Sequence, residues 1–259
     1  MRVLTDLQKQ LHAIKDGEMS VERAYGGGGR HNRLFENSPA GARFYCPICA
    51  RWYRRFKPFG LRGRRNAQCP GCGALERHRF LWLHLNERTH ALRHVRDILH
   101  VAPESCIQNA LLQKPGTRYL GIDRYDDDAN ATQQDLTNLT YAASCFDLLI
   151  CNHVLEHIPD DRAALSEIHR VLRPGGLALI MVPIDRNRQK TYEDPQIISP
   201  SARYEAFGHP YHVRLCGWDY ADRMRESGFN VREAHSTAMS EHKRRINRIN
   251  KTVLYHCTT

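Results

Sequence analysis

Short apolar runs alternate with helix-like segments along the C-terminal two thirds of this 259-residue chain. The runs that we expect to be buried strands cover residues 97–102, 118–123, 145–152 and 177–184. Between them, 105–113 and 160–176 show the apolar spacing of helices, and the second of these ends at Pro174-Gly175-Gly176. Such alternation favours an α/β fold that is built on a mostly parallel, doubly wound sheet.

The same pattern extends to both sides of this region. Helices are also predicted at 79–94 and 219–229, and strands at 230–236 and 252–259. We therefore assign residues 80–259 to one α/β domain. Its connection at about 185–217 is long for this fold and is expected to form a substrate pocket or a lid. Residues 1–40 contain a glycine run and are expected to be a partly flexible extension.

Two C-x2-C pairs, Cys46/Cys49 and Cys69/Cys72, precede the α/β domain with 19 residues between them. This spacing is typical of a four-cysteine structural zinc site, because each pair directs two thiolates at one ion. A module as small as 41–79 buries too little apolar area to fold without a bound metal ion. Two disulfides are the alternative, which an intracellular location would disfavour.

The segment between the two cysteine pairs is basic and aromatic. Its aromatic residues are Trp52, Tyr53, Phe56 and Phe59. Such side chains either stack on the bases of a single-stranded nucleic acid or dock the module onto the main domain. Docking is favoured, because a module that is tethered this closely has to cover apolar surface.

Basic charge is concentrated in the N-terminal third of the chain. The net charge is +10, and residues 1–96 hold 19 Lys and Arg against 7 Asp and Glu, whereas 97–259 hold 19 against 21. The asymmetry indicates either an anionic partner or only a solvated basic face. Arg77, His78 and Arg79 begin a predicted helix, where they either bind a carboxylate or phosphate or form an ordinary solvated helix start.

Polar residues at the ends of the predicted strands indicate a ligand crevice, since ligands of doubly wound sheets bind outside the carboxyl ends of the strands. The first strand runs into the turn 100–104, with the sequence His-Val-Ala-Pro-Glu. The second strand ends in Asp123, which is placed to accept both hydroxyls of a ribose. Asp135, a dozen residues further on, is a candidate for binding an adenine amino group.

The segment FDLLICNHVLEHIPDDRAALSEIHRVLRPGGLALIMVPI, residues 146–184, resembles the fourth strand, following helix and fifth strand of class I S-adenosylmethionine-dependent methyltransferases of the type 11 group. The resemblance covers about residues 97–259. The zinc module, with its CPxCGALERHR motif, also resembles that of a bacterial group of methyltransferases, in which it precedes the catalytic domain. The two resemblances together imply a seven-stranded, Rossmann-like methyltransferase fold with S-adenosylmethionine as cofactor, beside the zinc module.

The resemblance also implies a set of site residues. Those assigned to the cofactor are His100, Ala102, Glu104, Asp123, Arg124, Asp135, Leu136 and Asn152. The turn at 100–104 would pass the methionine part and Asp123 would bind the ribose. Asp135 would bind the adenine amino group, with Leu136 against the ring. Asn152 and His153 would lie beside the methyl-bearing sulfonium.

The chain departs from the family at the first of these motifs. Most members have G-x-G-x-G there, whereas this turn has no glycine. Glycine permits close backbone approach and unusual dihedral angles, so we expect a differently shaped turn that is partly fixed by Pro103. Glu104 is expected to replace the missing contact by pairing with the ammonium group of the cofactor. A degenerate domain without cofactor binding is the alternative.

Two histidines after the third apolar run, His153 and His157, are candidates for a general base. Methyl transfer is a displacement in which the enzyme positions the nucleophile and removes its proton. Imidazole has a reference pKa of about 6.5, which suits this role. His153 is the better candidate because it is nearer the strand end. The alternative is that both residues simply begin a helix.

The long connection adds candidates for substrate binding. The candidates are Tyr192, His209 and His212 from this connection, together with Arg77 and His78 from the predicted helix start. His209 and His212 also suit a metal ion, but the spacing of the sequence fixes no third ligand, so no second metal is predicted.

Three classes of function fit these features. The favoured one is a methyltransferase that acts on an O, N or S nucleophile of a small molecule or peptide, which can be anionic. The alternatives are an RNA methyltransferase that uses the basic module and a cofactor-binding protein without turnover. No apolar run is long enough to cross a bilayer, and the N-terminus lacks the apolar core of a secretory signal. We therefore expect a cytoplasmic protein without a membrane partner.

Overall fold

The computed structural model describes residues 41–61, 63–88, 92, 94–125 and 131–259. The predicted N-terminal extension, 1–40, lies outside the described residues. Within the described part of the chain, no helix has both the length and the apolar character needed to cross a membrane.

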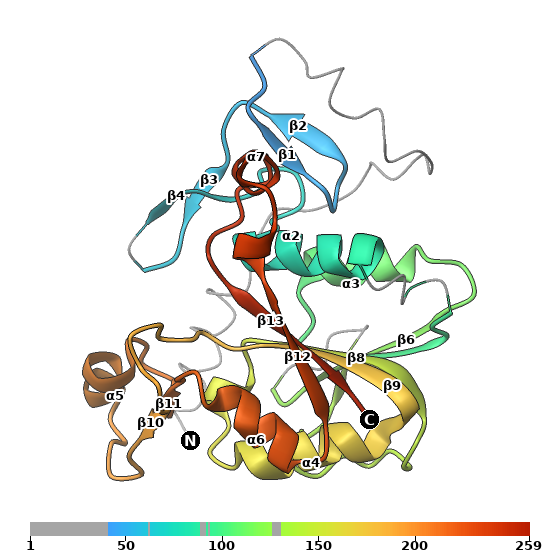
Figure 1. Cartoon of the computed structure of the whole chain (residues 1–259), viewed down its shortest axis with the longest axis vertical. Coiled ribbons are helices and arrows are strands. Elements are labelled where there is room, and N and C mark those ends of the chain that lie inside the picture. The colour runs from blue at the N-terminus through green and yellow to red at the C-terminus, as the bar shows by residue number, and fades with distance from the viewer. Residues whose placement is uncertain (1–40, 62, 89–91, 93, 126–130) are drawn as a thin grey trace.

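A seven-stranded sheet forms the centre of the molecule (Figure 1). Its strands are β5 (Asp97–Val101), β6 (Arg118–Asp123), β7 (Ala131–Gln133), β8 (Phe146–Asn152), β9 (Leu172–Met181), β12 (Asn230–His235) and β13 (Val253–Thr258). They lie in the order β12-β13-β9-β8-β5-β6-β7, and β13 runs antiparallel to both of its neighbours. The other pairings in this sheet are parallel. The structure thus confirms the predicted mostly parallel, seven-stranded α/β fold.

The strand order reverses at β5, which pairs with β6 on one side and β8 on the other. Val101, the last residue of β5, is in register with Ile122 of β6 and Cys151 of β8. The carboxyl ends of these three strands therefore meet at one edge. Such a reversal is where a doubly wound sheet opens a crevice for a ligand.

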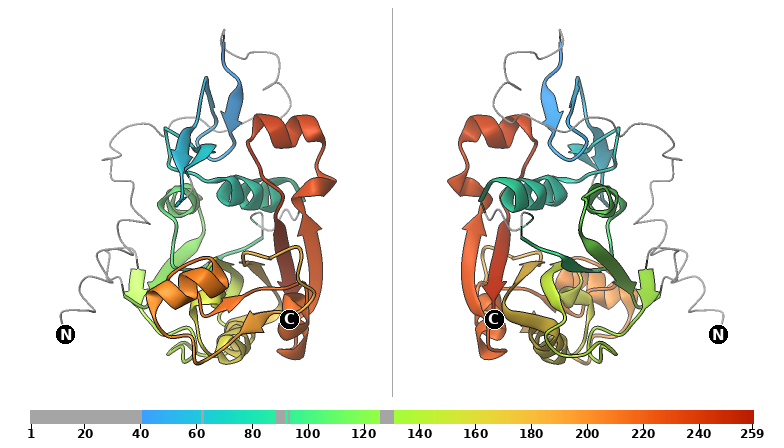
Figure 2. Two further views of the ribbon diagram at one scale, coloured as in Figure 1. Left: turned by 90° about the vertical axis from the view of Figure 1, so that its left-hand side faces the viewer. Right: turned by 90° about the vertical axis from the view of Figure 1, so that its right-hand side faces the viewer.

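Helices cover both faces of the sheet because alternate strand residues point to opposite sides. Leu149 and Cys151 share a core with residues of α4 (Asp161–Val171) and α6 (Tyr220–Glu226). Leu148 and Ile150 share the opposite core with residues of α2 (Glu76–Leu83) and α3 (Ser105–Leu112). Figure 2 shows these layers from two sides.

Three elements differ from the sequence prediction. α2 ends at Leu83 and continues as a π-helical turn, His84–Arg88, so the helix is shorter than 79–94. α4 ends at Val171, because the next residues already pair with β8 as the start of β9. β7 was not predicted, since its three residues are polar or small and two of them are exposed.

The cysteine module consists of two small hairpins. They are β1 (Phe44–Cys46) with β2 (Arg51–Tyr53), and β3 (Lys57–Phe59) with β4 (Arg64–Gln68). Between β12 and β13 the chain forms a 3-10 turn, η4 (Ser236–Ala238), and α7 (Glu241–Ile246). α7 contacts β1, so the C-terminal hairpin of the sheet reaches the module (Figure 1).

Arg79 joins the module to the main domain. Its guanidinium has no exposed surface and donates hydrogen bonds to carbonyl oxygens on both sides. The acceptors are Ala67 (2.9 Å) and Ala74 in the module, and Asn247 (2.6 Å) and Arg248 (2.8 Å) after α7. The prediction that Arg79 binds an anion or lies at a solvated helix start is therefore wrong.

Phe56 supports the docking interpretation of the aromatic segment. Its side chain is buried, and the guanidinium carbon of Arg79 lies 4.7 Å from the centre of its ring. The ring of Tyr53 packs edge-on against Phe56, and the ring of Phe44 packs on it from a tilted angle. The aromatic residues of the module thus form part of the joint.

The long connection after β9 is ordered by short elements of its own. These are β10 (Tyr192–Glu193), α5 (Pro200–Phe207) and β11 (Arg214–Leu215), and β10 pairs with β11. Ser199 caps the N-terminus of α5, with its hydroxyl accepting from the Ala202 amide, and Gly208 caps the C-terminus with a φ of 75°. Both are typical helix boundaries.

Candidate functional site

The four cysteine sulfurs of the module form one cluster, with all of them within 4.8 Å of one another. Cys46 Sγ lies 3.5 Å from Cys72 Sγ, and Cys49 Sγ lies 3.7 Å from Cys69 Sγ. Sulfurs that bind a tetrahedral ion at about 2.3 Å are themselves about 3.8 Å apart. The cluster therefore fits one ion, and all four residues are free thiols rather than disulfide partners.

The turn after β5 takes a left-handed conformation although it contains no glycine. Ala102 has a φ of 46°, and its amide donates to the carbonyl of Ile122 (2.7 Å) at the end of β6. An L-residue adopts this conformation at a cost, which glycine avoids. The turn therefore has the backbone shape that a glycine-rich motif would favour, achieved with alanine.

Glu104 is the polar centre of the crevice, and its side chain is 15% exposed. Its Oε2 accepts from His100 Nε2 (3.1 Å) and from Asn152 Nδ2 (3.3 Å). His100 in turn accepts at Nδ1 from the Tyr119 hydroxyl (3.0 Å), which fixes the imidazole tautomer. The other oxygen, Oε1, lies 3.2 Å from His78 Nε2.

The Glu104 carboxyl is ionised at neutral pH. Burial raises its pKa, but the interactions with His78 and His100, which include a hydrogen bond from each ring, outweigh burial and hold the pKa well below its ordinary value. The same burial lowers the pKa of His78 to about 4, so this imidazole is neutral. A carboxylate with partly satisfied oxygens thus lies at the mouth of the crevice.

Two acceptor atoms at this position fit the ammonium group of the predicted cofactor. Asn152 Oδ1 is buried and has no hydrogen-bond partner among the described residues, and the only neighbour of Glu104 Oε1 that the structure records is His78 Nε2 at 3.2 Å. Buried acceptors of this kind normally have a donor. An ammonium group offers three N–H donors and a positive charge.

The acids predicted at the next strand ends lie where the sequence places them. Asp123 is buried at the tip of β6 and accepts from the Tyr125 amide (2.9 Å). Asp135 Oδ1 accepts from the amide and hydroxyl of Thr137, and Oδ2 lies 3.2 Å from an Arg124 nitrogen. Leu136 is buried in the core between them. These contacts fix both carboxylates in orientation.

His153 and Glu156 form a pair directly after β8. His153 has a φ of 53°, and its amide donates to the Met181 carbonyl (2.8 Å). Its Nδ1 lies 3.2 Å from Oε1 of Glu156, whose side chain is fully buried. Burial raises the pKa of Glu156, but His153 outweighs it and lowers the pKa to about 2. The carboxylate favours a proton on Nδ1, which leaves Nε2 of His153 as the basic nitrogen.

A pocket of about 390 Å³ opens beside His153, between the module, the segment after β9 and the C-terminal hairpin. Arg77, Arg186 and Lys251 place positive charge in its wall, where the one carboxylate, Glu76, is paired with Arg64 at 3.2 Å. Trp218 gives the pocket an aromatic side. The Nε atom of Arg77 is buried and has no hydrogen-bond partner among the described residues. The pocket is therefore suited to a small anionic molecule.

The other predicted substrate residues do not line this pocket. His78 lies behind Glu104, where its Nδ1 accepts from the Leu75 amide (3.2 Å). Tyr192 packs on Phe207 in the long connection, and His209 and His212 lie in a separate cluster. A larger cavity, about 870 Å³, lies over the opposite ends of β8 and β9 beside Asp147 and Arg173, and it contains none of the predicted site residues.

Arg214 anchors the long connection to the segment after β8, and the sequence analysis missed it. Its buried guanidinium donates to the carbonyls of Leu155 (2.6 Å), Ile158 (2.7 Å) and Pro159 (2.8 Å). It also donates to Glu193 (2.8 Å) of β10. A single arginine between Val213 and Leu215 gives no signal in the sequence for such a role.

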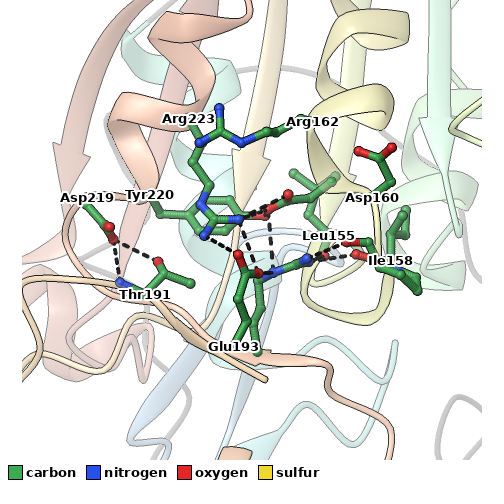
Figure 3. A network of polar contacts seen from close by, with 12 residues as sticks. Leu155, Ile158, Asp160, Arg162, Thr191, Glu193, Asp219, Tyr220 and Arg223 are labelled. Carbon is green, nitrogen blue, oxygen red and sulfur yellow. Dashed lines mark hydrogen bonds and ion pairs between the residues drawn. The ribbon is translucent and has the colours of Figure 1, made fainter. Parts of the chain in front are cut away.

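Figure 3 shows that further ion pairs surround this anchor. Arg223 of α6 contacts Glu193 (2.8 Å) and Asp161 (3.1 Å), and the Tyr220 hydroxyl donates to Asp161 (2.7 Å). Thr191 donates to Asp219 through its amide and hydroxyl, both at 2.7 Å. The long connection is therefore attached to α4 and α6 at several points.

Three histidines come together where the long connection meets the segment after β8. They are His157 from the 3-10 turn η3 (Leu155–His157) and His209 and His212 from the long connection. One nitrogen of each lies within 4.8 Å of one nitrogen of the others. The structure thus supplies the third ligand that the sequence spacing did not fix. Burial lowers the pKa of His212 to about 3, so its imidazole is neutral.

Comparison with known proteins gives one family match. Residues 99–180 match the family model described as "Methyltransferase domain". No curated protein matches the chain.

Solved structures show a similar arrangement at low identity. An S-adenosylmethionine-dependent methyltransferase from Mesorhizobium loti is 16% identical, with 69% of this chain and 97% of that chain covered and a TM-score of 0.47. One from Archaeoglobus fulgidus is 13% identical, with 70% and 99% covered and a TM-score of 0.46. A 1,6-didemethyltoxoflavin N1-methyltransferase from Burkholderia thailandensis, solved with S-adenosylhomocysteine, is 16% identical, with 70% and 85% covered and a TM-score of 0.45.

The matched residues 99–180 run from β5 to β9 and contain the turn, the strand ends and the His153–Glu156 pair described above. This match identifies residues 99–180, in the central part of the seven-stranded sheet, as a methyltransferase domain.

Proposed function

We propose that this methyltransferase acts on a small anionic molecule, which binds in the pocket beside His153 and presents an oxygen or nitrogen nucleophile. The observation that carries the proposal is Arg77. Its Nε is buried without a partner among the described residues, in the wall of a pocket that His153 also lines. A guanidinium in this state is suited to a carboxylate or phosphate group of the substrate.

The crevice at the ends of β5, β6 and β8 would hold the cofactor. Glu104 and the Asn152 carbonyl oxygen would accept from its ammonium group, since Glu104 carries a negative charge and Asn152 Oδ1 is a buried acceptor without a donor among the described residues. Asp123 would accept from the ribose hydroxyls and Asp135 from the adenine amino group. When bound, S-adenosylmethionine supplies a methyl group on a positively charged sulfur.

The backbone and remaining side chains of the crevice would shape this site. Ala102 would bring the turn close to the methionine part, and His100 would keep the Glu104 carboxylate in place through its 3.1 Å hydrogen bond. Leu136 would pack on the adenine ring, and Arg124 would orient Asp135 through their 3.2 Å ion pair. His78 would act through Glu104 rather than on the substrate.

His153 would act as the general base in the transfer. Its Nε2 would take the proton that the substrate nucleophile loses on methylation. The buried carboxylate of Glu156, 3.2 Å from Nδ1, would stabilise the imidazolium that results. His157 is the weaker candidate, because its Nδ1 donates to the Tyr211 carbonyl (3.0 Å) and its ring belongs to the histidine cluster.

The cysteine cluster would hold a structural zinc ion. The set of four sulfurs leaves no coordination position open, so the ion would brace the module instead of taking part in the reaction. The module would contribute to the substrate pocket through Arg64 and, at the start of α2, through Glu76 and Arg77.

A methyl-transfer assay with labelled cofactor and a panel of small carboxylates and phosphates tests the proposal. We expect Arg77→Ala to raise the KM of an accepted substrate at least about tenfold, because the variant loses one charge-assisted hydrogen bond to the substrate. The Kd of the cofactor should not change. Arg55→Ala, at an exposed position of the module, is the matched control. Equal KM values for Arg77→Ala and the parent protein would remove the basis of the proposal.

RNA is the second candidate substrate, because exposed basic residues cover the module. They are Arg43, Arg51, Arg54, Arg55, Lys57, Arg64 and Arg65. Binding of RNA oligonucleotides at two salt concentrations, followed by the methyl-transfer assay, distinguishes the two candidates. Methyl transfer to RNA that Arg55→Ala weakens and Arg77→Ala does not would favour RNA over the small anion.

A further inference from the structure

We propose that His157, His209 and His212 form a second metal site, which takes a transition-metal dication of the zinc class and is separate from the cysteine cluster. The inference does not depend on the proposed substrate. It is carried by the convergence of three imidazoles from two segments that are about 50 residues apart in the sequence, with a nitrogen of each within 4.8 Å of the others.

The rings are already close enough for a small movement to bring their nitrogens onto one ion. The ring centres of His157 and His212 are 4.7 Å apart, and those of His209 and His212 are 4.5 Å apart. Three nitrogens bound at about 2.0–2.1 Å to a tetrahedral ion lie about 3.4 Å from one another. His209 and His212 lie between α5 and β11, outside any helix, so rotation about their side-chain bonds would be the movement that closes the remaining gap.

One ligand is already oriented as metal-bound histidines usually are. His157 Nδ1 donates to the Tyr211 carbonyl (3.0 Å), which leaves Nε2 as the lone-pair nitrogen. His209 requires one change, because its Nδ1 now accepts from the Tyr211 amide at 3.3 Å. That hydrogen bond is long, and metal binding at Nε2 would replace it.

The backbone on both sides of the cluster is held in place. Arg214, two residues after His212, donates to the carbonyls of Leu155 and Ile158, which flank His157. The Val213 amide also donates to the Glu156 carbonyl (2.9 Å). The two ligand-bearing segments are thus joined by direct hydrogen bonds, which gives the site a rigid support.

Glu156 supplies an independent reason for a cation at this place. Its carboxylate is fully buried, Oε2 has no hydrogen-bond partner among the described residues, and Oε1 has only histidine neighbours. Oε1 lies 3.2 Å from His153 Nδ1 and 4.0 Å from His212 Nε2. A buried carboxylate with so few partners is expensive, and a dication beside His212 would compensate its charge.

The ligand set selects the ion and its coordination. Three imidazole nitrogens suit Zn²⁺, Ni²⁺ or Cu²⁺ rather than Mg²⁺ or Ca²⁺, which prefer oxygen. Three protein ligands leave the fourth position of a tetrahedral ion to water or to an oxygen of a bound molecule. The site therefore differs in kind from the closed four-sulfur cluster.

Metal analysis of the whole chain, purified without a polyhistidine tag, tests the inference. The protein is loaded with Zn²⁺, loosely held ion is removed by gel filtration, and zinc is measured by mass spectrometry. We expect two ions per chain in the parent protein, one for each cluster, and one in His212→Ala. His94→Ala, at an exposed histidine outside the cluster, is the matched control and should retain two.

Cobalt separates the two sites spectroscopically. Reconstitution with Co²⁺ should give thiolate charge-transfer bands from the sulfur cluster and visible bands from a nitrogen-ligated ion. His212→Ala and His157→Asn should both lose the second set and keep the first, which also shows that these variants are folded. One ion per chain in the parent protein, or two in His212→Ala, would overturn the inference. Because no cofactor or substrate is present, neither result depends on methyl transfer.

Discussion

Nδ1 of His153 lies 3.2 Å from Oε1 of Glu156, a carboxylate with no exposed surface. The two residues are three positions apart and meet because His153 takes a left-handed conformation, with a φ of 53°, where β8 ends. The backbone therefore turns the imidazole onto the carboxylate and leaves its other edge to the pocket. This relationship underlies the first prediction.

Removal of the base should lower the rate of methyl transfer and leave cofactor binding intact. We expect His153→Ala to reduce kcat by about 10²–10⁴-fold, the usual contribution of a positioned base. Glu156→Gln should reduce kcat less, because the imidazole remains. Isothermal titration with S-adenosylhomocysteine supplies the control. An unchanged kcat in His153→Ala would assign proton removal to another group.

The Glu104 carboxylate should determine affinity for the cofactor. Glu104→Gln retains the size of the side chain but loses the charge that faces the ammonium group. We expect the Kd of S-adenosylmethionine to rise by about 10–100-fold, the value of a charge-assisted hydrogen bond. 5′-Methylthioadenosine, which has no ammonium group, should bind the variant and the parent protein equally. An equal loss for both ligands would point to a general collapse of the crevice.

Glu104 should also make the stability of the protein depend on pH. Its pKa in the folded protein lies well below the ordinary value, so the carboxylate stabilises the fold at any pH above the unfolded pKa of about 4.3. This contribution is lost as the pH falls from there through the folded pKa. The difference in unfolding free energy between the parent protein and Glu104→Gln should therefore shrink below pH 4.3.

Urea unfolding at a series of pH values between 7 and 3 measures this difference. Glu205→Gln, at an exposed position, controls for the general effect of removing a carboxylate. A difference for Glu104→Gln that is constant over the series, or grows toward low pH, would contradict the depressed pKa.

Arg79 should be essential for the joint between the module and the domain. Lysine keeps the charge but cannot donate to four carbonyl oxygens in different directions. We expect Arg79→Lys to lower the unfolding free energy by about 3 kcal/mol or more, because several buried carbonyls lose their donor. Urea unfolding measures the effect, with Arg55→Lys as the exposed control. A loss below 1 kcal/mol would mean that the joint has other support.

Replacing the left-handed alanine in the turn after β5, Ala102, by glycine should stabilise the folded protein. Ala102→Gly relieves a conformational cost of about 1–2 kcal/mol and adds about 0.5–1 kcal/mol of chain entropy to the unfolded state. A net gain of about 0.5–1 kcal/mol is expected, seen as a higher Tm. Ala102→Val should lower the Tm, since a β-branched residue tolerates this φ less well. Destabilisation by glycine would show that the φ of 46° carries no strain.

The sequence alone determined the class of fold and the acids at the strand ends. Apolar runs of strand length reveal β5, β6, β8 and β9 because burial on both faces demands continuous hydrophobicity. A position at the carboxyl end of a parallel strand implies a place at the crevice, so Asp123 and Asn152 needed only strand ends to be placed. The cysteine cluster follows from local spacing in the same way.

Tertiary structure decided what depends on contacts between distant segments. Nothing in the local sequence distinguishes Arg79 from Arg77. Yet Arg79 donates its hydrogen bonds to backbone carbonyls that lie far apart in the sequence, such as those of residues 67 and 248, whereas Arg77 lines the pocket. His157, the third histidine of the cluster, lies beside His209 and His212 because hydrogen bonds from Val213 and Arg214 join the two segments. Periodicity and spacing report neighbours along the chain, whereas these roles arise from chain crossings that only the packed fold creates.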